Sequence, residues 1–158
     1  MSTDIAAAKI YTTGHGYALD SFQVLGRHRD GEHYRDLIRE TEEGLALALA
    51  PETALGAPPT GRVSRWVKHF PVEPGVRIER TRSGGAWQVF ATCADRPGLL
   101  SAIARELLDH GLNLVDARVT TLGARAEDVF VVNGAALESA AGREAFSEKL
   151  RAVLGEER

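Results

Sequence analysis

Six consecutive residues, 95–100, are the part of this chain best suited to chemistry, and they read Asp-Arg-Pro-Gly-Leu-Leu. They stand between a strand-like run and a helical run. The Asp95 carboxylate can cap backbone N–H groups that open a helix, and Pro97 fits the first helical turn, where its N–H is not needed. Because Gly98 has no side chain, a small ligand can approach its amide. A strand, a turn and a helix N-terminus in this order suit a carboxylate or another anion.

The helix that follows is predicted over 96–110, with Gly111 as its C-terminal stop. Its apolar face has helical spacing and consists of Leu99, Leu100, Ile103, Leu107 and Leu108. Asn113 then starts the next strand, and its amide can both donate to and accept from an amino-acid ligand. The predicted ligand-binding residues are Asp95, Arg96, Pro97, Gly98, Leu99, Leu112, Asn113 and Leu114. The alternative is a strand-to-helix turn that binds nothing.

An internal repeat is the second informative feature. Residues 8–14 align with 117–123, and residues 20–24 align with 128–132, with a one-residue change of offset between the two blocks. Such a difference belongs in a turn, so each copy predicts a strand, a turn and a strand. A predicted strand and helix precede the second copy, whereas residues 1–5 are too few for such a unit. We expect that the first copy has lost an opening β-α unit and that the chain is a fragment or a truncated product. Alternatively, that copy never had the unit.

Composition limits the classes of function. The chain has 158 residues, of which 44% are hydrophobic and 26% are charged, which suits one soluble domain or two small ones. Its net charge of -3 gives no support for nucleic-acid binding through a basic surface. A single cysteine rules out an intramolecular disulfide and fits a reducing compartment. No apolar run reaches membrane-spanning length and no signal peptide is recognisable, so the expected location is cytoplasmic.

Two units are predicted, at 1–82 and 83–158, with the turn 83–85 as their boundary. In the first unit we predict strands at 5–11 and 18–25, a helix at 34–50, a linker at 51–61 and a strand near Val76. The helix should bury Leu37, Ile38, Thr41, Leu45 and Leu49. In the second unit, strand 86–93, helix 96–110, strands 112–121 and 127–133, and helix 139–154 lack only a last strand to be ferredoxin-like.

The second unit resembles an ACT domain, a small ligand-sensing β-α-β-β-α-β module. The residues that carry this resemblance are 95–100, 117–123 and 126–132, with 8–13 and 18–22 in the first unit and 70–76 between the units. More narrowly, the chain resembles the C-terminal ACT pair of the bifunctional uridylyltransferase and uridylyl-removing enzymes that modify the PII nitrogen-signalling protein. The resemblance implies an α+β fold of tandem ACT (ferredoxin-like βαββαβ) domains, the first lacking its opening β-α unit.

As this resemblance implies, the module would sense an amino acid, glutamine, and report nitrogen status to a uridylyltransferase. A stand-alone ACT interaction or dimerisation module without a small-molecule ligand is the alternative. The expected partners are a second copy in a homodimer or other ACT or catalytic domains, with PII protein only through a full-length enzyme, and neither nucleic acid nor membrane.

The sequence has no glycine-serine turn followed by paired aspartates and no histidine-aspartate metal cluster. We therefore predict no catalytic residue, no metal ligand and no cofactor in this chain. In the enzymes that it resembles, Mg²⁺ would belong to a catalytic domain that this chain lacks. The chain would count as an enzyme only through such full-length relatives.

Two strands carry reactive side chains to which we assign no chemistry. Cys93 lies on a strand whose alternate residues Val89 and Ala91 are apolar, so we expect a small buried core residue rather than a nucleophile. Glu127 and Asp128 are adjacent on a strand, so they face opposite sides and cannot act as a carboxylate pair.

Overall fold

The structure is a computed structural model, and it describes residues 3–13, 15, 17–26, 34–50 and 72–156. Its elements are β1 (Thr3–Thr12), β2 (Ala18–Gly26), α1 (Tyr34–Ala48), β3 (Gly75–Arg80), β4 (Trp87–Ala94), α3 (Leu99–Asp109), β5 (Asn113–Leu122), β6 (Arg125–Asn133), the short 3-10 helix η1 (Ala135–Leu137) and α4 (Ala140–Leu154). The predicted helices and strands are confirmed in type and order, with small shifts at their ends. The predicted linker at 51–61 lies outside the described residues. None of the described helices is long and apolar enough to cross a membrane.

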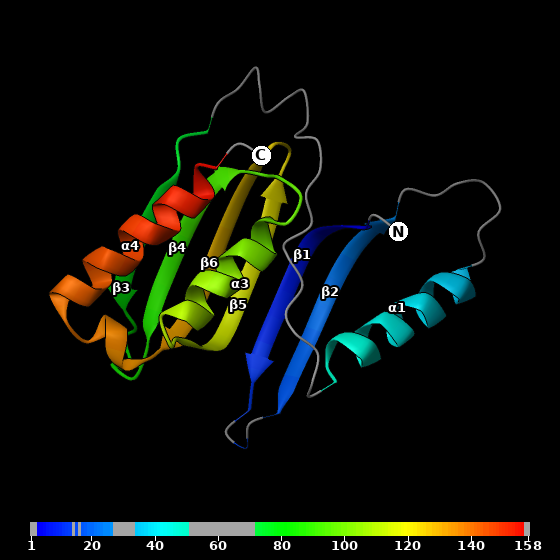
Figure 1. Ribbon diagram of the computed structural model, residues 1–158, viewed down its shortest axis with the longest axis horizontal. Coiled ribbons are helices and arrows are strands. Elements are labelled where there is room, and N and C mark those ends of the chain that lie inside the picture. Colours follow the sequence, from blue (N-terminus) through cyan, green and yellow to red (C-terminus); the bar gives the residue numbers. More distant parts are fainter. Residues whose placement is uncertain (1–2, 14, 16, 27–33, 51–71, 157–158) are drawn as a thin grey trace.

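The six strands form one antiparallel sheet in the order β2-β1-β5-β6-β4-β3. Helices α3 and α4 lie on one face of this sheet, over the part that β3 to β6 form (Figure 1). β3 pairs with the outer edge of β4, from Gly75 opposite Thr92 to Arg80 opposite Trp87. The second unit therefore has a four-stranded sheet, although no strand follows α4 in the described chain. This is the α+β, ferredoxin-like architecture that the sequence predicts.

The two copies of the repeat fold as hairpins with the same register. Ala8 pairs with Phe22 in the β1–β2 hairpin. Their counterparts in the second copy, Ala117 and Phe130, pair in the β5–β6 hairpin. The extra residue of the first copy falls in its turn, as the change of offset predicts.

The two hairpins are also joined to each other, through β1 and β5. Lys9 lies opposite Arg118, which is its own counterpart in the repeat. The neighbouring pairs are reciprocal, namely Ala8 with Val119 and Ile10 with Ala117. A local two-fold axis therefore passes between Lys9 and Arg118 and relates the two copies.

Burial differs strongly between the two copies. Phe130 and Val132 of β6 lie under the helices, with 4% and 0% of their surface exposed. Their counterparts on β2, Phe22 and Val24, keep 48% and 49% exposed. The reason is that α3 and α4 cover only the second copy, and no described helix covers the same face of β1 and β2 (Figure 1). The core of the molecule therefore sits in the second unit.

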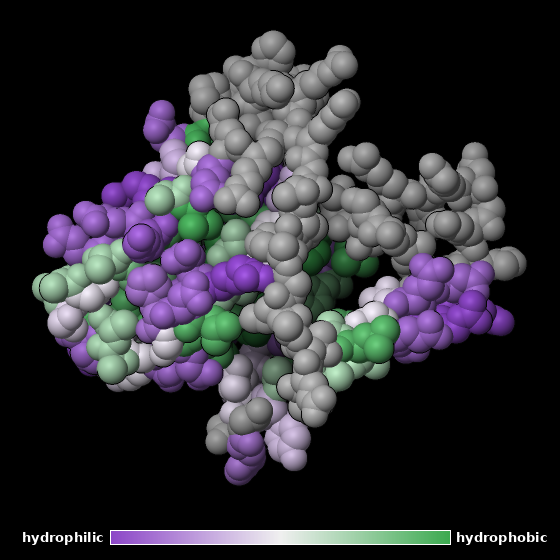
Figure 2. All heavy atoms as spheres, viewed as in Figure 1, coloured by the Kyte–Doolittle hydropathy of each residue, from purple (hydrophilic) through white to green (hydrophobic). Residues whose placement is uncertain are grey.

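The predicted buried face of α1 is wrong. Ile38, Thr41, Leu45 and Leu49 are all exposed, and the side chain of Leu37 is outside the described set. The helix stands apart from the sheet beyond β2 in Figure 1, and apolar atoms gather at its C-terminal end in Figure 2. Helical spacing correctly predicted the helix, but it could not indicate whether another element covers its apolar side.

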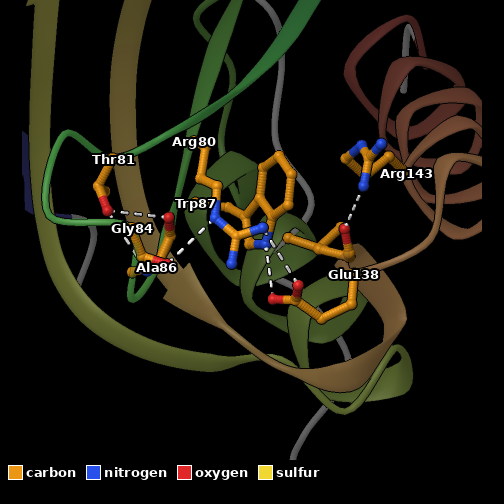
Figure 3. A network of polar contacts seen from close by, with 8 residues as sticks. Arg80, Thr81, Gly84, Ala86, Trp87, Glu138 and Arg143 are labelled. Atoms are coloured by element: carbon orange, nitrogen blue, oxygen red, sulfur yellow. Dashed lines mark hydrogen bonds and ion pairs between the residues drawn. The ribbon is translucent and has the colours of Figure 1, made fainter.

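A polar network closes the core where β4 begins (Figure 3). Two guanidinium groups lie over the indole of Trp87, with Arg80 at 5.1 Å and Arg143 at 4.5 Å from the ring centroid. The indole Nε1 donates to Glu138 Oε1 at 3.1 Å, and Glu138 Oε2 lies 3.4 Å from Arg80. Arg143 also donates to the Leu137 carbonyl at 2.7 Å. These contacts fix the start of α4 against the β3–β4 hairpin.

Replacement of Gly142 by alanine is expected to destabilise the fold. A Cβ atom at this position would overlap the Ala136 carbonyl oxygen, so the backbone would have to move. We expect Gly142→Ala to lower the free energy of unfolding by about 1–3 kcal/mol in urea denaturation followed by circular dichroism. Gly44→Ala in α1 is the control, because no atom lies within 4 Å of a Cβ there and alanine is the better helix former. Equal stability of the two variants would contradict the packing around α4.

Candidate ligand site

Residues 96–99 form a β-turn that precedes α3. The Leu99 N–H donates to the Arg96 carbonyl at 3.2 Å, and Gly98 has φ 78° and ψ 3°. These are the angles of the third residue in a type II turn, where glycine is favoured after proline. Helix α3 therefore begins at Leu99, and the prediction that Pro97 lies in its first turn is wrong. Gly98, rather than Asp95, occupies the N-cap position.

Gly111 ends α3 as the sequence predicts. It has φ 62°, and its N–H donates to the Leu108 carbonyl at 2.9 Å. The next N–H, of Leu112, donates to the Leu107 carbonyl at 2.8 Å. This pair of bonds is a Schellman motif, which satisfies carbonyls at the end of a helix. Leu108 is exposed and does not belong to the buried face that was predicted for α3.

The structure does not bring the two halves of the predicted ligand site together. Residues 95–99 lie at the N-terminus of α3, whereas Leu112, Asn113 and Leu114 follow its C-terminus. A helix of 11 residues is about 16 Å long, which is too far for one small ligand to bridge. Beyond the C-terminus of α3, the Leu114 carbonyl accepts a hydrogen bond from Thr12 Oγ1 of β1 at 2.9 Å.

Arg96 links the turn to the end of α4. Its Nη2 donates to the Val153 carbonyl at 2.8 Å, in the last turn of that helix. Its Nε is buried and has no hydrogen-bond acceptor among the described residues. A buried donor without an acceptor is costly, and a carboxylate is a strong acceptor for a guanidinium. The adjoining N-terminus of α3 favours an anion as well.

Asp128 is the charged residue buried in the described core, with 2% of its surface exposed. It lies on the helix-facing side of β6, opposite Ala91 of β4. Its Oδ1 accepts the Thr120 N–H at 3.2 Å. Within the described ranges, no lysine or arginine forms an ion pair with this carboxylate.

Burial raises the pKa of Asp128 to about 6, with the Thr120 N–H opposing the rise and the Asp95 carboxylate adding to it. Burial likewise raises the pKa of the Cys93 thiol to about 12, with Asp128 adding to the rise and Arg96 opposing it. Cys93 is 1% exposed, which confirms the prediction of a buried core residue. Asp95 and Arg96 follow Cys93 just beyond the end of β4, on the way to α3.

Sequence reasoning missed Asp128 as a candidate site residue. It considered Asp128 only as a partner for Glu127, and the two do face opposite sides of the sheet. One signal was present: Asp128 interrupts an alternating apolar pattern formed by Ala126, Phe130 and Val132, which are all buried. An acid at a core position of a strand indicates either a structural hydrogen bond or a ligand contact.

Asp128→Asn is expected to change how stability depends on pH. The pKa of Asp128 is about 6 in the folded protein against 3.8 for an ordinary aspartate, so the folded state holds a proton that the unfolded chain loses. This group alone should lower the free energy of unfolding by roughly 3 kcal/mol as pH rises from about 4 to above 6. The asparagine variant should lack that part of the slope and be more stable than wild type above pH 6. Parallel pH profiles in chemical denaturation would contradict the burial of the charge.

Comparison with known proteins shows what this chain is similar to. Residues 87–149 match the ACT domain family. The chain is similar to three bifunctional uridylyltransferase/uridylyl-removing enzymes. It is 50% identical over 135 residues to that of Chromobacterium violaceum, 44% over 151 residues to that of Thiobacillus denitrificans, and 46% over 134 residues to that of Ralstonia nicotianae. No solved structure shows a detectable match to the chain.

The alignments cover most of this chain but a small part of each relative. They span 85%, 96% and 82% of the chain, and 16%, 18% and 15% of the respective relatives. The matched ACT segment contains the 96–99 turn, α3, Asp128 and most of α4. The chain therefore contains an ACT domain and corresponds to the ACT regulatory region of the bifunctional uridylyltransferase/uridylyl-removing enzymes.

Proposed function

We propose that this chain is the amino-acid-sensing part of a PII uridylyltransferase and that its ligand is glutamine. The observation that carries the proposal is the N-terminal end of α3, where a glycine turn adjoins Arg96 with its buried Nε lacking an acceptor among the described residues. The guanidinium, the helix dipole and the first backbone N–H groups of α3 all favour a carboxylate there. Uridylyl transfer, its Mg²⁺ ion and contact with PII would belong to the longer enzyme.

The start of β1 borders this proposed site. β1 runs antiparallel to β5 with Ala7 opposite Thr120, so β1 begins at the same end of the sheet as the 96–99 turn (Figure 1). Ile5, near the start of β1, packs against the core. We therefore place the ligand between the α3 N-terminus and the start of β1, where it would contact both copies of the repeat. Asn113 lies at the opposite end and would not take part.

Glutamine should bind the purified chain in isothermal titration calorimetry, and Gly98→Val should weaken this binding by at least about tenfold. Valine at φ 78° strains the turn and obstructs approach to its backbone. Gly84→Val is the matched control, because Gly84 has φ 77° and open space around a Cβ, in the β3–β4 turn away from the site. Equal weakening by both variants would show an effect on the fold alone. Absence of binding by glutamine and by every other amino acid would refute the proposal.

A second candidate, an ACT interaction module, is favoured by the first copy of the repeat. β2 is an edge of the described sheet, whereas its counterpart β6 is paired on both sides. Phe22 and Val24 lie half exposed beside this edge. A strand edge next to an uncovered apolar face favours pairing with another chain. We propose that this surface joins a second copy in a homodimer.

Light scattering at micromolar concentration should therefore give a mass above that of the monomer. Phe22→Lys should reduce the mass, because it places a charge on the apolar face of the edge strand. Gln23→Lys changes the net charge equally on the opposite face of the same strand and should have little effect. A monomeric wild type that unfolds in one cooperative step would exclude this candidate and show that the copies complete each other within one molecule.

A further inference from the structure

Two apolar surfaces in the described part of the chain are left open to solvent. The first lies on the helix-facing side of the β1–β2 hairpin, where Phe22 and Val24 are 48% and 49% exposed. The second is the side of α1 that carries Ile38, Leu45 and Leu49, which are 41%, 53% and 78% exposed. Their spacing along the helix places these three side chains on one face. A sheet face without a helix and a helix without a sheet face are complementary surfaces.

Helix α4 shows how a helix in the position of α1 packs. Each of these helices follows one copy of the hairpin, α1 after β1–β2 and α4 after β5–β6. α4 packs against β3 and β4, the two strands beyond β6, and buries Phe146, Leu150 and Leu154. The local two-fold axis gives α1 the corresponding place, over two strands beyond β2. Figure 1 shows α1 standing beyond β2, although β2 is the edge of the described sheet.

We propose that a second copy of this chain supplies those two strands. The β2 edges of two copies pair antiparallel, and α1 of each copy packs on the β1–β2 hairpin of the other, over Phe22 and Val24. This inference rests on the homodimer proposed above and deepens it, because it names the helix that covers the apolar face. A two-fold axis between the paired strands makes the two helix contacts identical, as is usual in homodimers.

The size of these contacts suits a stable dimer. α1 has 15 residues, so it is about 22 Å long and about 10 Å wide. Two reciprocal contacts of this footprint cover about 900 Å² on the two chains together, before the paired strand edges are counted. A specific interface buries at least about 1,000 Å² in total, so the helices and the edges together reach this range.

Packing of α1 on the hairpin of its own chain would satisfy less of the structure. It would cover Phe22 and Val24, but β2 would keep an unpaired edge beside them. An unpaired edge favours association with another chain. A second copy covers the sheet face and the helix face and pairs the edge in one interface.

Cysteine cross-linking of the full chain tests the contact between α1 and the partner hairpin. Chains with Val24→Cys and chains with Leu45→Cys, which carry tags of different mass, are incubated together and oxidised. We expect a mixed disulfide-linked dimer in a non-reducing gel. Leu47→Cys replaces Leu45→Cys in the matched control, because Leu47 is 72% exposed on the other side of α1. Its yield should be at least about fivefold lower, since a disulfide requires close Cα atoms.

Two further samples complete the cross-linking experiment. The wild-type chain is the blank, because its single cysteine, Cys93, is 1% exposed. A chain that carries both Val24→Cys and Leu45→Cys should form linked dimers as well. A disulfide within one monomer of this variant would show that α1 covers its own hairpin, and it would overturn the inference.

Leu45→Glu provides a readout without cross-linking. Sedimentation equilibrium should show a dimer dissociation constant at least about tenfold higher than that of wild type, because each dimer loses two buried leucines and gains two carboxylates in an apolar contact. Leu47→Glu makes the same chemical change on the other side of the helix and should leave the constant within about twofold. Both positions are exposed in the single chain, so circular dichroism should show equal folding of the two variants.

The outcomes distinguish the dimer from the way in which it is built. If the wild-type chain is monomeric, the proposed homodimer fails and this inference fails with it. If the chain is dimeric but Leu45→Glu and Leu47→Glu weaken the dimer equally, or neither does, the inference alone is overturned. Equal cross-linking of Val24→Cys to both positions of α1, or to neither, also overturns it.

Discussion

The antiparallel ladder between β1 and β5 is the interaction on which the rest of this structure depends. It joins the two copies of the repeat edge to edge around Lys9 and Arg118. Like charges directly opposite each other in a sheet are destabilising, by up to about 1 kcal/mol, so these side chains do not hold the ladder together. The ladder is held together by its backbone hydrogen bonds and by packing on the other face of the sheet, where Ala8 and Ala117 are 5% and 0% exposed. Without this ladder the β1–β2 hairpin would be an isolated two-stranded unit, which is at best marginally stable.

The two copies that this ladder joins place equivalent residues in different environments. In the second copy, α3 and α4 cover the apolar face and bury Phe130, whereas the equivalent Phe22 stays half exposed. The ladder also brings the start of β1 to the end of the sheet that holds the 96–99 turn. A ligand there would contact both copies, so its binding could influence how they pair. Under the proposed function, this contact is the physical route by which ligand binding would reach both copies.

Local patterns in the sequence predicted local structure well. Alternation predicted the hairpins, helical spacing predicted the helices, and Gly111 marked the end of α3. Properties that depend on tertiary placement were not accessible in this way. Spacing shows that the apolar residues of α1 share a face, but not that any element covers it. Gly98 precedes α3 and Asn113 follows it, so the two residues are close in the sequence, but the length of the helix separates them in the fold. Asp128 was overlooked because only the folded sheet shows that its carboxylate is buried. The boundary expected between residues 82 and 83 stays a prediction.

The most direct test of this account is an NMR measurement of the β1–β5 ladder in the intact chain. Nuclear Overhauser effects between backbone protons of residues 7–11 and 116–120 report this pairing directly. The account predicts cross-strand contacts in the observed register, with Lys9 opposite Arg118 and reciprocal contacts on either side. Amides of β1 that exchange freely with solvent, and no contacts to β5, would contradict it. The two copies would then be separate units, and the ligand site proposed between them would not exist.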